Sequence, residues 1–263
     1  MRPLVMGVLN VTPDSFSDGG RYLDPDLALA RGLEMVAEGA DIVDVGGESS
    51  RPGADPVPEA EECRRVLPVI AALCRHVRVS VDTVKPGVAD AAVEVGATLV
   101  NDISATLWPV AARHRVGWVA MHMQGTPRTM QKDPRYADVA SEVRTFVLSK
   151  ASEAAAAGVD EVWIDPGIGF GKTVDQNLAL LRRLPELAAH GFPLMVGTSR
   201  KSFLGRLTPQ SNGRPAPAGD RLAASLATAT WALVAGAGMV RVHDVAATVQ
   251  AATLVGPTGL VPA

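Results

Sequence analysis

The sequence predicts an α/β fold, a TIM (β/α)8 barrel, built as a single domain over residues 1–263. Three observations favour it. The chain has 263 residues, close to the ~250 that such a barrel usually needs. Short apolar runs recur along the chain, and most of them follow a glycine and end in a polar residue. Glycine suits the left-handed position after a helix, and short apolar runs suit the strands of a parallel sheet that is covered on both faces.

Eight of these runs are expected to form strands, which is the number that a barrel requires. They span residues 4–10, 42–44, 77–82, 99–102, 118–120, 162–165, 194–197 and 239–243. The segments between them have helical spacing: Leu29, Leu33 and Val36 form one apolar stripe, and Val143 and Val147 belong to another. The alternative is an open doubly wound sheet. Such a sheet carries a glycine-rich fingerprint after its first strand, and the residues at 8–12, Val-Leu-Asn-Val-Thr, are not one.

Three segments need separate interpretation. Pro68 lies in a predicted helix that also holds Cys63 and Cys74, and it should kink or restart that helix. The two cysteines would lie roughly 16 Å apart along the helix axis, so we expect free thiols and no disulfide. Residues 222–240 carry no charge and could span a bilayer, but we interpret them as a buried helix, a glycine stop and the start of a strand. Residues 208–219 are predicted to be a surface loop between the seventh strand and the last helix.

The composition excludes several kinds of partner. The net charge is -3 and aromatic residues make up 4% of the chain, so neither a basic field nor a set of stacking platforms is available for nucleic acid. The first residues lack the apolar core of a signal peptide and enter a strand directly. We therefore expect a cytoplasmic protein that binds neither nucleic acid nor membrane.

The polar residues that close the strands are the candidate site. In a TIM barrel the active site lies at the carboxyl ends of the strands, so these side chains are expected to converge on one cavity. A single residue of this kind can be a helix cap, but such residues at nearly every strand end indicate a site. They are Asn10, Asp44, Asp82, Asn101, His122, Asp165, Lys201, Arg241 and His243.

The residue types suggest two chemistries. Asn10, Arg51, Arg241 and His243 can hold an anion, because arginine supplies a bidentate fork and this fold often binds phosphate after strands seven and eight. Asn10 can also offer a hard oxygen to Mg²⁺, which prefers few protein ligands and several phosphate oxygens. A second set is rich in acceptors and fits a flat heterocycle with adjacent donors. It consists of Asp82, Asn101, Asp165 and Lys201.

Two glycine- and hydroxyl-rich loops follow the first two strands, at residues 10–20 and 46–53. Their place at the catalytic end favours a lid over a plain surface loop. The tripeptide Gly171-Lys172-Thr173 is not a phosphate-binding loop, since Pro166 stands where the first glycine of that motif is required.

Eight segments together resemble the dihydropteroate synthases, and the resemblance covers nearly the whole chain. The first, Met-Gly-Val-Leu-Asn-Val-Thr-Pro-Asp-Ser-Phe-Ser-Asp-Gly-Gly, and the last, Arg-Val-His-Asp-Val, are highly specific. The segments lie at 6–20, 47–53, 80–83, 101–103, 121–125, 165–172, 199–202 and 241–245.

This resemblance implies an enzyme that condenses a dihydropterin-methyl diphosphate with 4-aminobenzoate, giving dihydropteroate and diphosphate. It further implies Mg²⁺, a homodimer and sensitivity to sulfonamides. By matching positions, Asp82, Asn101, Asp165 and Lys201 would hold the pterin, while Asn10, Arg51, Arg241 and His243 would hold the diphosphate, with Asn10 on the metal. Ser50, Pro52, Phe170, Arg200 and Ser202 would lie near the aminobenzoate.

Catalytic roles are implied for Asp82, Lys201, Arg241 and His243. We expect the carboxylate of Asp82 to stabilise the positive charge that develops when diphosphate departs. Two positions depart from the common family pattern: Ser50 stands where threonine is frequent, and Ile168 where phenylalanine is frequent.

Two other functions are alternatives. A pterin-binding methyltransferase barrel would share the acceptor set but has no need of Arg51, Arg241 and His243 as a diphosphate clamp. A catalytically inactive paralogue, acting as a partner in the folate pathway, would be expected to have lost strand-end residues, and the set here is intact.

Overall fold

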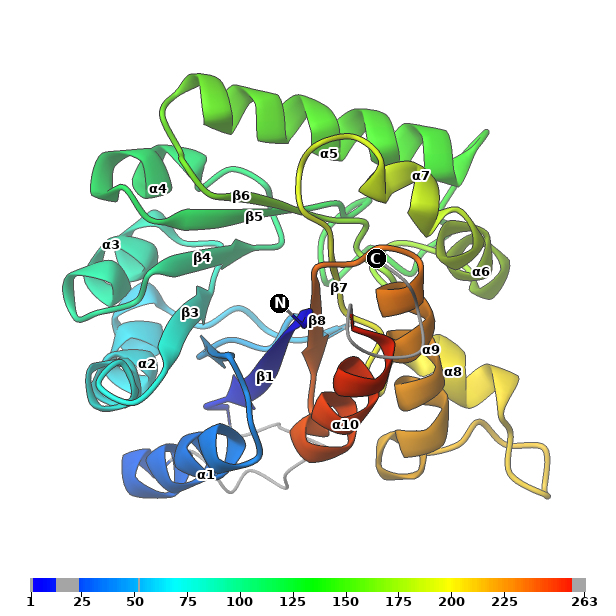
Figure 1. Cartoon of the computed structure of the whole chain (residues 1–263), viewed down its shortest axis with the longest axis horizontal. Coiled ribbons are helices and arrows are strands. Elements are labelled where there is room, and N and C mark those ends of the chain that lie inside the picture. Colours follow the sequence, from blue (N-terminus) through cyan, green and yellow to red (C-terminus); the bar gives the residue numbers. More distant parts are fainter. Residues whose placement is uncertain (1, 13–23, 52, 257–263) are drawn as a thin grey trace.

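A computed structural model describes residues 2–12, 24–51 and 53–256 of the chain. It contains one parallel sheet of eight strands in the order β6-β5-β4-β3-β2-β1-β8-β7. An isolated parallel bridge between Ile164 and Leu194 joins β6 to the segment that precedes β7, so the sheet curls into a nearly closed barrel (Figure 1). The strands are β1 Leu4–Asn10, β2 Ile42–Gly46, β3 Arg78–Asp82, β4 Leu99–Asp102, β5 Gly117–Met121, β6 Val162–Asp165, β7 Met195–Val196 and β8 Met239–Val242.

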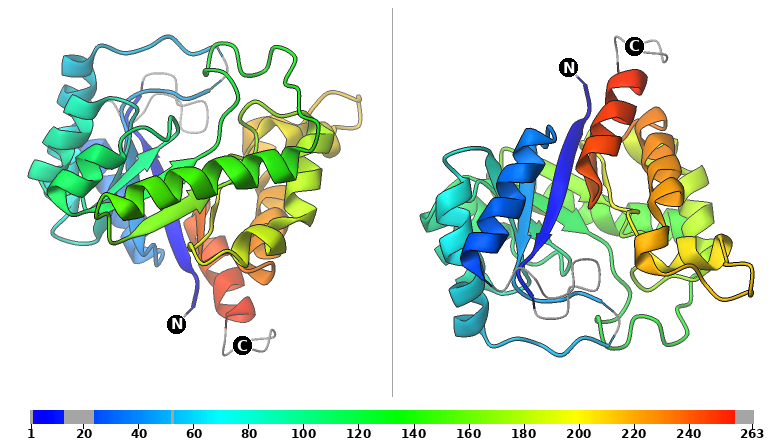
Figure 2. Two further views of the ribbon diagram at one scale, coloured as in Figure 1. Left: turned by 90° about the horizontal axis from the view of Figure 1, so that it is seen from above. Right: turned by 90° about the horizontal axis from the view of Figure 1, so that it is seen from below.

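Helices cover the outside of this sheet (Figures 1 and 2). One helix follows each of the first five strands, two α-helices follow β6, two more follow β7, and α10 follows β8. Helices α10 and α1 lie on either side of β1 (Figure 2). The predicted TIM barrel is therefore confirmed, and the doubly wound alternative is wrong. The helices are α1 Pro25–Ala37, α2 Glu59–Leu73, α3 Pro86–Glu94, α4 Trp108–His114, α5 Val139–Ala156, α6 Val174–Arg182, α7 Leu184–Ala188, α8 Ser202–Leu207, α9 Leu222–Val234 and α10 Val245–Val255.

The strand pleat places the site directly above the core of the barrel. Successive side chains of a strand alternate between its faces, so a residue and the second one after it point the same way. Ile42, Leu99, Trp163 and Met239 belong to the apolar cluster inside the barrel. Two residues after each of them come Asp44, Asn101, Asp165 and Arg241.

The predicted helices are present, but the apolar stripe predicted for each helix does not always match the residues that are buried. On α5 the expected residues Val143 and Val147 are buried. On α1 the predicted stripe holds only in part: Leu29 and Val36 are partly buried and pack against the core, but Leu33 is exposed, and the fully buried positions are Ala28, Gly32 and Met35. Small residues face inward there because α2 lies close: an added Cβ at Gly32 would come within 2.7 Å of Leu73.

Three local expectations have mixed outcomes. Both cysteines are free, as predicted, although Cys74 is the residue after α2 and not part of it. Pro68 does not restart the helix, since α2 continues through it. The loop at 208–219 lies largely on the surface, but the helix after it is α9, and α10 follows as a further helix.

The uncharged stretch at 222–240 forms α9, a glycine-containing turn and the start of β8, as predicted. The helix is not buried as expected, however, because Trp231 and Val234 are about half exposed. Within the described ranges of the chain, no helix is both long and apolar enough to cross a membrane.

Candidate active site

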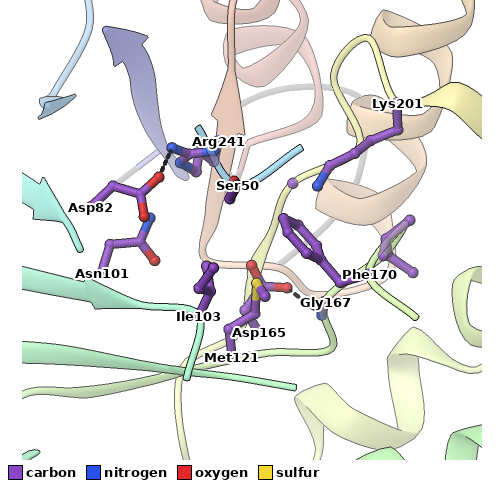
Figure 3. A pocket seen from close by; sticks show the side chains of 12 residues that line it. Ser50, Asp82, Asn101, Ile103, Met121, Asp165, Gly167, Phe170, Lys201 and Arg241 are labelled. Atoms are coloured by element: carbon purple, nitrogen blue, oxygen red, sulfur yellow. Dashed lines mark hydrogen bonds and ion pairs between the residues drawn. The ribbon is translucent and has the colours of Figure 1, made fainter. Parts of the chain in front are cut away.

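A cavity opens at the carboxyl ends of the strands, and all four residues predicted to hold the heterocycle line it (Figure 3). They come from β3, β4, β6 and the loop after β7. Arg241 of β8 joins them, and so do Ser50 and Phe170 from the predicted aminobenzoate set. The lining residues are Ser50, Asp82, Asn101, Ile103, Met121, Asp165, Gly167, Ile168, Phe170, Gly197, Lys201 and Arg241.

A buried ionic network crosses one side of this cavity. Nε of Arg241 donates to Oδ2 of Asp44 at 2.6 Å, and Nη2 donates to Oδ2 of Asp82 at 2.7 Å. Nδ2 of Asn101 donates to the same oxygen of Asp44 at 2.8 Å. Asp44 is fully buried, and its other oxygen has no partner among the described residues. A single guanidinium thus balances two buried carboxylates. These two ion pairs hold Arg241 beside the pocket predicted for the heterocycle, and Arg241 is also the residue predicted to bind the diphosphate.

Burial shifts the pKa values of the charged groups in the cavity toward their neutral forms. It raises the pKa of Asp82 to about 7, with Arg241 opposing the shift and Asp44 adding to it. Burial likewise raises the pKa of Asp165, although the hydrogen bond from the N–H of Gly167 acts in the opposite direction. It lowers the pKa of Lys201 to about 7, helped by the charge of Arg241. Groups that titrate near neutral pH in a cleft are typical of catalytic sites.

The opposite side of the cavity is apolar and flat. The ring of Phe170 lies under the ammonium of Lys201, whose Nζ is 3.7 Å from the ring centroid. Ile103 and Met121 complete this wall, together with Ile168. An aromatic face next to a row of acceptors suits a planar ring that donates hydrogen bonds along one edge.

A glycine-rich turn after β6 shapes this wall. Asp165 accepts a hydrogen bond from the backbone N–H of Gly167 at 2.7 Å. Gly167 has a positive φ of 64°, and an added Cβ there would lie 1.9 Å from the carbonyl oxygen of His122. Only glycine can therefore occupy this position, because the turn is pressed directly against the loop after β5.

We expect Gly167→Ala to lower the free energy of unfolding by about 3 kcal/mol, since it combines left-handed strain with a backbone clash. Gly158→Ala is the matched control: Gly158 also has a positive φ, of 89°, but an added Cβ would meet nothing within 4 Å. Its cost should be about 1 kcal/mol. Urea unfolding of both variants measures the difference, and equal losses would contradict the proposed close packing at Gly167.

The predicted diphosphate residues surround the same strand ends but do not all line the central cavity. His243 lines a neighbouring depression next to α1 together with Arg200. Its Nδ1 is 3.0 Å from Oγ of Ser199. Burial lowers the pKa of His243 well below its usual value, with contributions from Arg200, Arg241, Arg51 and Lys201. The ring is therefore neutral and stands near four basic side chains, of which Arg241 and Arg200 are also paired with carboxylates.

Several predicted site residues have other environments. Arg200 makes a bidentate ion pair with Asp244, at 2.6 and 3.1 Å. Ser202 begins α8 with an exposed side chain, and Pro52 lies outside the described residues. The ring of His122 does not reach the cavity, which corrects the expectation that every strand-end residue converges there: it packs at 5.1 Å against Phe146.

Two groups of residues near the site, and one contact, were not predicted from the sequence. Asp44 was predicted as a strand-end site residue, but its contact with Arg241 depends on the closure of the barrel. Ile103 directly follows β4, and Met121 is the last residue of β5. Both belong to motifs recognised in the sequence, so their position at a strand end could have identified them as cavity residues. Glu48 anchors the loop after β2: its Oε2 accepts from Nζ of Lys85 at 2.7 Å and from the N–H of Val57 at 2.6 Å.

The barrel and the cavity together define a class: a (β/α)8 enzyme whose strand ends bind a flat, donor-rich ring beside an anion. Comparisons with known proteins agree. The sequence model of the family described as "Pterin binding enzyme" matches residues 6–243. The chain therefore belongs to the pterin-binding enzyme family, among its dihydropteroate synthases.

Individual relatives give the same result. A dihydropteroate synthase of Mycobacterium leprae is 48% identical over 262 residues, which cover 96% of this chain and 92% of that protein. The crystal structure of Yersinia pestis dihydropteroate synthase with a sulfonamide drug complex has a TM-score of 0.91 at 43% identity, covering 97% and 93% of the two chains. The Burkholderia cenocepacia enzyme complexed with 7,8-dihydropteroate has a TM-score of 0.83 at 47% identity, covering 96% and 90%.

Proposed function

We propose that this chain joins 7,8-dihydropterin-6-ylmethyl diphosphate to 4-aminobenzoate and releases 7,8-dihydropteroate and diphosphate. The observation that carries the proposal is the cavity in which Asp82, Asn101 and Asp165 present acceptors opposite the ring of Phe170. A pterin has a ring N–H and an amino group side by side, and a carboxylate can accept from both. The dihydropteroate bound to the Burkholderia relative supports this ligand class.

The charges of the cavity suit a dissociative substitution. The C–O bond to the diphosphate breaks and its electron pair leaves with the diphosphate. Positive charge then develops on the methylene carbon and spreads into the pterin. The carboxylate of Asp82 stabilises that charge from a fixed, buried position, which favours the transition state over the neutral ground state. The arylamine nitrogen of 4-aminobenzoate then forms the C–N bond and loses a proton.

Arg241 links the two halves of this reaction. Its guanidinium contacts Asp82 at 2.7 Å, so the group expected to hold the leaving diphosphate touches the group expected to hold the carbocation. His243, as a neutral ring near Arg200 and Arg51, adds a further contact for the anion. This arrangement would keep the leaving group and the developing charge adjacent.

The donor set at the end of β1 fits Mg²⁺. Oδ1 of Asn10 is a hard oxygen at the end of β1, and it lies 3.6 Å from the position that a Cβ on Gly46 would take. The nearby Oδ2 of Asp82 accepts from Arg241, so Asn10 is the candidate protein ligand. Within the residues that the structure describes, no cluster of three or more His, Cys, Asp or Glu side chains forms a metal cage. Mg²⁺ with few protein ligands matches its preference for substrate phosphates. When bound through Asn10, it would neutralise charge on the leaving diphosphate.

We also propose that the chain forms a homodimer. Trp231 and Val234 of α9 and Leu254 of the neighbouring helix α10 are all about half exposed, at 50%, 45% and 58%. Large apolar side chains that remain exposed on adjacent helices are typical of an interface. Sedimentation of the chain and of a Val234→Glu variant would test this. The cytoplasmic location stays a prediction of the sequence.

Diphosphate release tests the proposed reaction. We expect sustained release from dihydropterin-methyl diphosphate only when 4-aminobenzoate and Mg²⁺ are both present, with dihydropteroate formed in equal amount. Pterin binding without release under any condition would contradict the proposal and favour an inactive paralogue. The methyltransferase alternative is disfavoured, because relatives of 43–48% identity over nearly the whole chain are dihydropteroate synthases.

A further inference from the structure

Lys172 is a buried lysine that the proposed reaction does not use. Its side chain is 2% exposed. The Nζ atom donates to the carbonyl oxygens of Gly167 and Phe170, each at 2.9 Å, and to that of His122 at 3.3 Å. It also lies 3.0 Å from Nδ1 of His122. Lys172 is not among the residues that line the cavity, so its contacts are with backbone and one ring only.

These contacts join two loops that form the heterocycle half of the site. His122 directly follows β5, whose last residue Met121 lines the cavity. Gly167 and Phe170 belong to the turn after β6, and both line the cavity. The same turn holds Asp165 through its bond to Gly167. One ammonium group therefore connects the backbone on both sides of the acceptor and the aromatic wall.

The surroundings of Nζ favour the protonated ammonium form. Three of its partners are carbonyl oxygens, which can only accept. His122 packs against the ring of Phe146, and burial lowers the pKa of this histidine to about 3, so its ring is neutral and Nδ1 can accept as well. A neutral amine would direct its lone pair at one of these acceptors.

This charge is buried and needs compensation. Burial lowers the pKa of Lys172 to about 7, and the carboxylate of Asp165 opposes the shift. An apolar residue at this position would avoid the cost of desolvating a charge. The placement of the ammonium among carbonyls that shape the cavity indicates a specific structural task.

We propose that Lys172 is a positioning residue for the pterin half of the site. Its ammonium holds the turn at 167–171 against His122 and so fixes Asp165 and Phe170 in the geometry that receives the ring, without touching the substrate. This inference rests on the proposed pterin-binding function.

The test replaces Lys172 with Met, which keeps the length of the side chain and removes the ammonium. Calorimetry would measure the binding of two probes: 6-hydroxymethylpterin, and inorganic diphosphate with Mg²⁺. We expect Lys172→Met to weaken pterin binding and to lower kcat/KM for the pterin substrate by about 10²-fold, the size typical of a misplacement of ~1 Å. Diphosphate binding should stay within about twofold, because Arg241 and His243 do not contact Lys172.

Thr173→Ala is the matched control. Thr173 is the next residue, its side chain is exposed, and its Oγ1 caps α6 by accepting from the N–H of Gln176 at 3.2 Å. This variant should lower the melting temperature and leave pterin binding unchanged. If Lys172→Met does not fold, Lys172→Gln, which retains two N–H donors, is measured in its place by the same criteria.

Two results would overturn the inference: a folded variant that binds the pterin as tightly as the wild type, or equal weakening of both probes, which would show a general structural role. A wild-type chain that does not bind the pterin would instead overturn the proposed function. The two failures are therefore distinguishable.

Discussion

Asp82→Asn is expected to lower kcat by about 10²- to 10³-fold, the usual size of the loss when one electrostatic group of a transition state is removed. Asparagine keeps an acceptor oxygen at the same place, so pterin binding should weaken by less than about tenfold. The reason is that the charge of Asp82 interacts with the developing carbocation and much less with the neutral pterin. Steady-state kinetics together with calorimetric binding of 6-hydroxymethylpterin would measure both quantities.

Asp165→Asn is the matched comparison, because Asp165 is a second buried carboxylate of the same cavity. We expect the opposite pattern there, with pterin binding reduced more than kcat. If Asp82→Asn loses its activity entirely through weaker pterin binding, the carboxylate acts in the ground state and the proposed role is wrong.

The pH profile gives an independent check on Asp82. Its pKa is raised to about 7, so the active carboxylate form is gained as pH rises through neutrality. The acid limb of kcat/KM, which reports the free enzyme, should therefore fall below about pH 7. Asp82→Asn should remove this limb and leave any alkaline limb from Lys201, whose pKa is lowered to about 7.

Arg241→Leu should lower the free energy of unfolding by about 3–5 kcal/mol near pH 8, the usual cost of removing one partner from a buried ion pair. Arg241 is the shared cation of Asp44 and Asp82, and without it both buried carboxylates lack compensation. The loss should depend on pH. The folded pKa of Asp82 already exceeds its ordinary value of 3.8, and losing Arg241 raises it further. The folded state then binds more protons than the unfolded state, so stability falls as pH rises from about 4 through neutrality.

Denaturant unfolding at pH 5 and pH 8 would measure this. Arg64→Leu is the control, because the ion pair of Arg64 with Glu61 is exposed on α2 and such pairs contribute less than about 1 kcal/mol. Adding Asp44→Asn to Arg241→Leu should restore part of the stability, since one uncompensated charge is removed. A loss that is the same at both pH values would contradict the proposed network.

Most of the barrel and half of the site could be predicted from the sequence, and the reason is periodicity. A polar residue two positions after an inward apolar residue must share its face, so Asn101 and Asp165 could be placed without coordinates. Side chains that contact each other across the closed barrel could not. The sequence assigns Arg241 to an anion, but only closure of the sheet brings β8 and β2 to either side of β1 and places Arg241 against Asp44.

Side-chain direction in loops was also beyond reach. His122 has the position of a site residue, yet its ring packs against Phe146 because the loop after β5 runs beside α5. From the sequence, Lys172 belongs to the recognised segment 165–172 and to a tripeptide that is not a phosphate-binding loop, and neither indicates its contacts. Its actual partners are carbonyl groups of a turn with positive φ at Gly167, Gly169 and Gly171, and the course of such a turn does not follow from spacing.

The short strand β7 makes one seam of the barrel different from the others. Among the described residues, β6 meets the neighbouring segment through the isolated bridge at Ile164 and Leu194, with the N–H of Ile164 donating to Pro193 at 3.0 Å. Local opening costs least where the fewest hydrogen bonds must break. Deuterium exchange should therefore reach the amide of Ile164 before those of β1 and β2. Asp165 and Gly197 lie on opposite sides of this seam. Local opening along the seam would therefore change the width of the cavity that receives the ring.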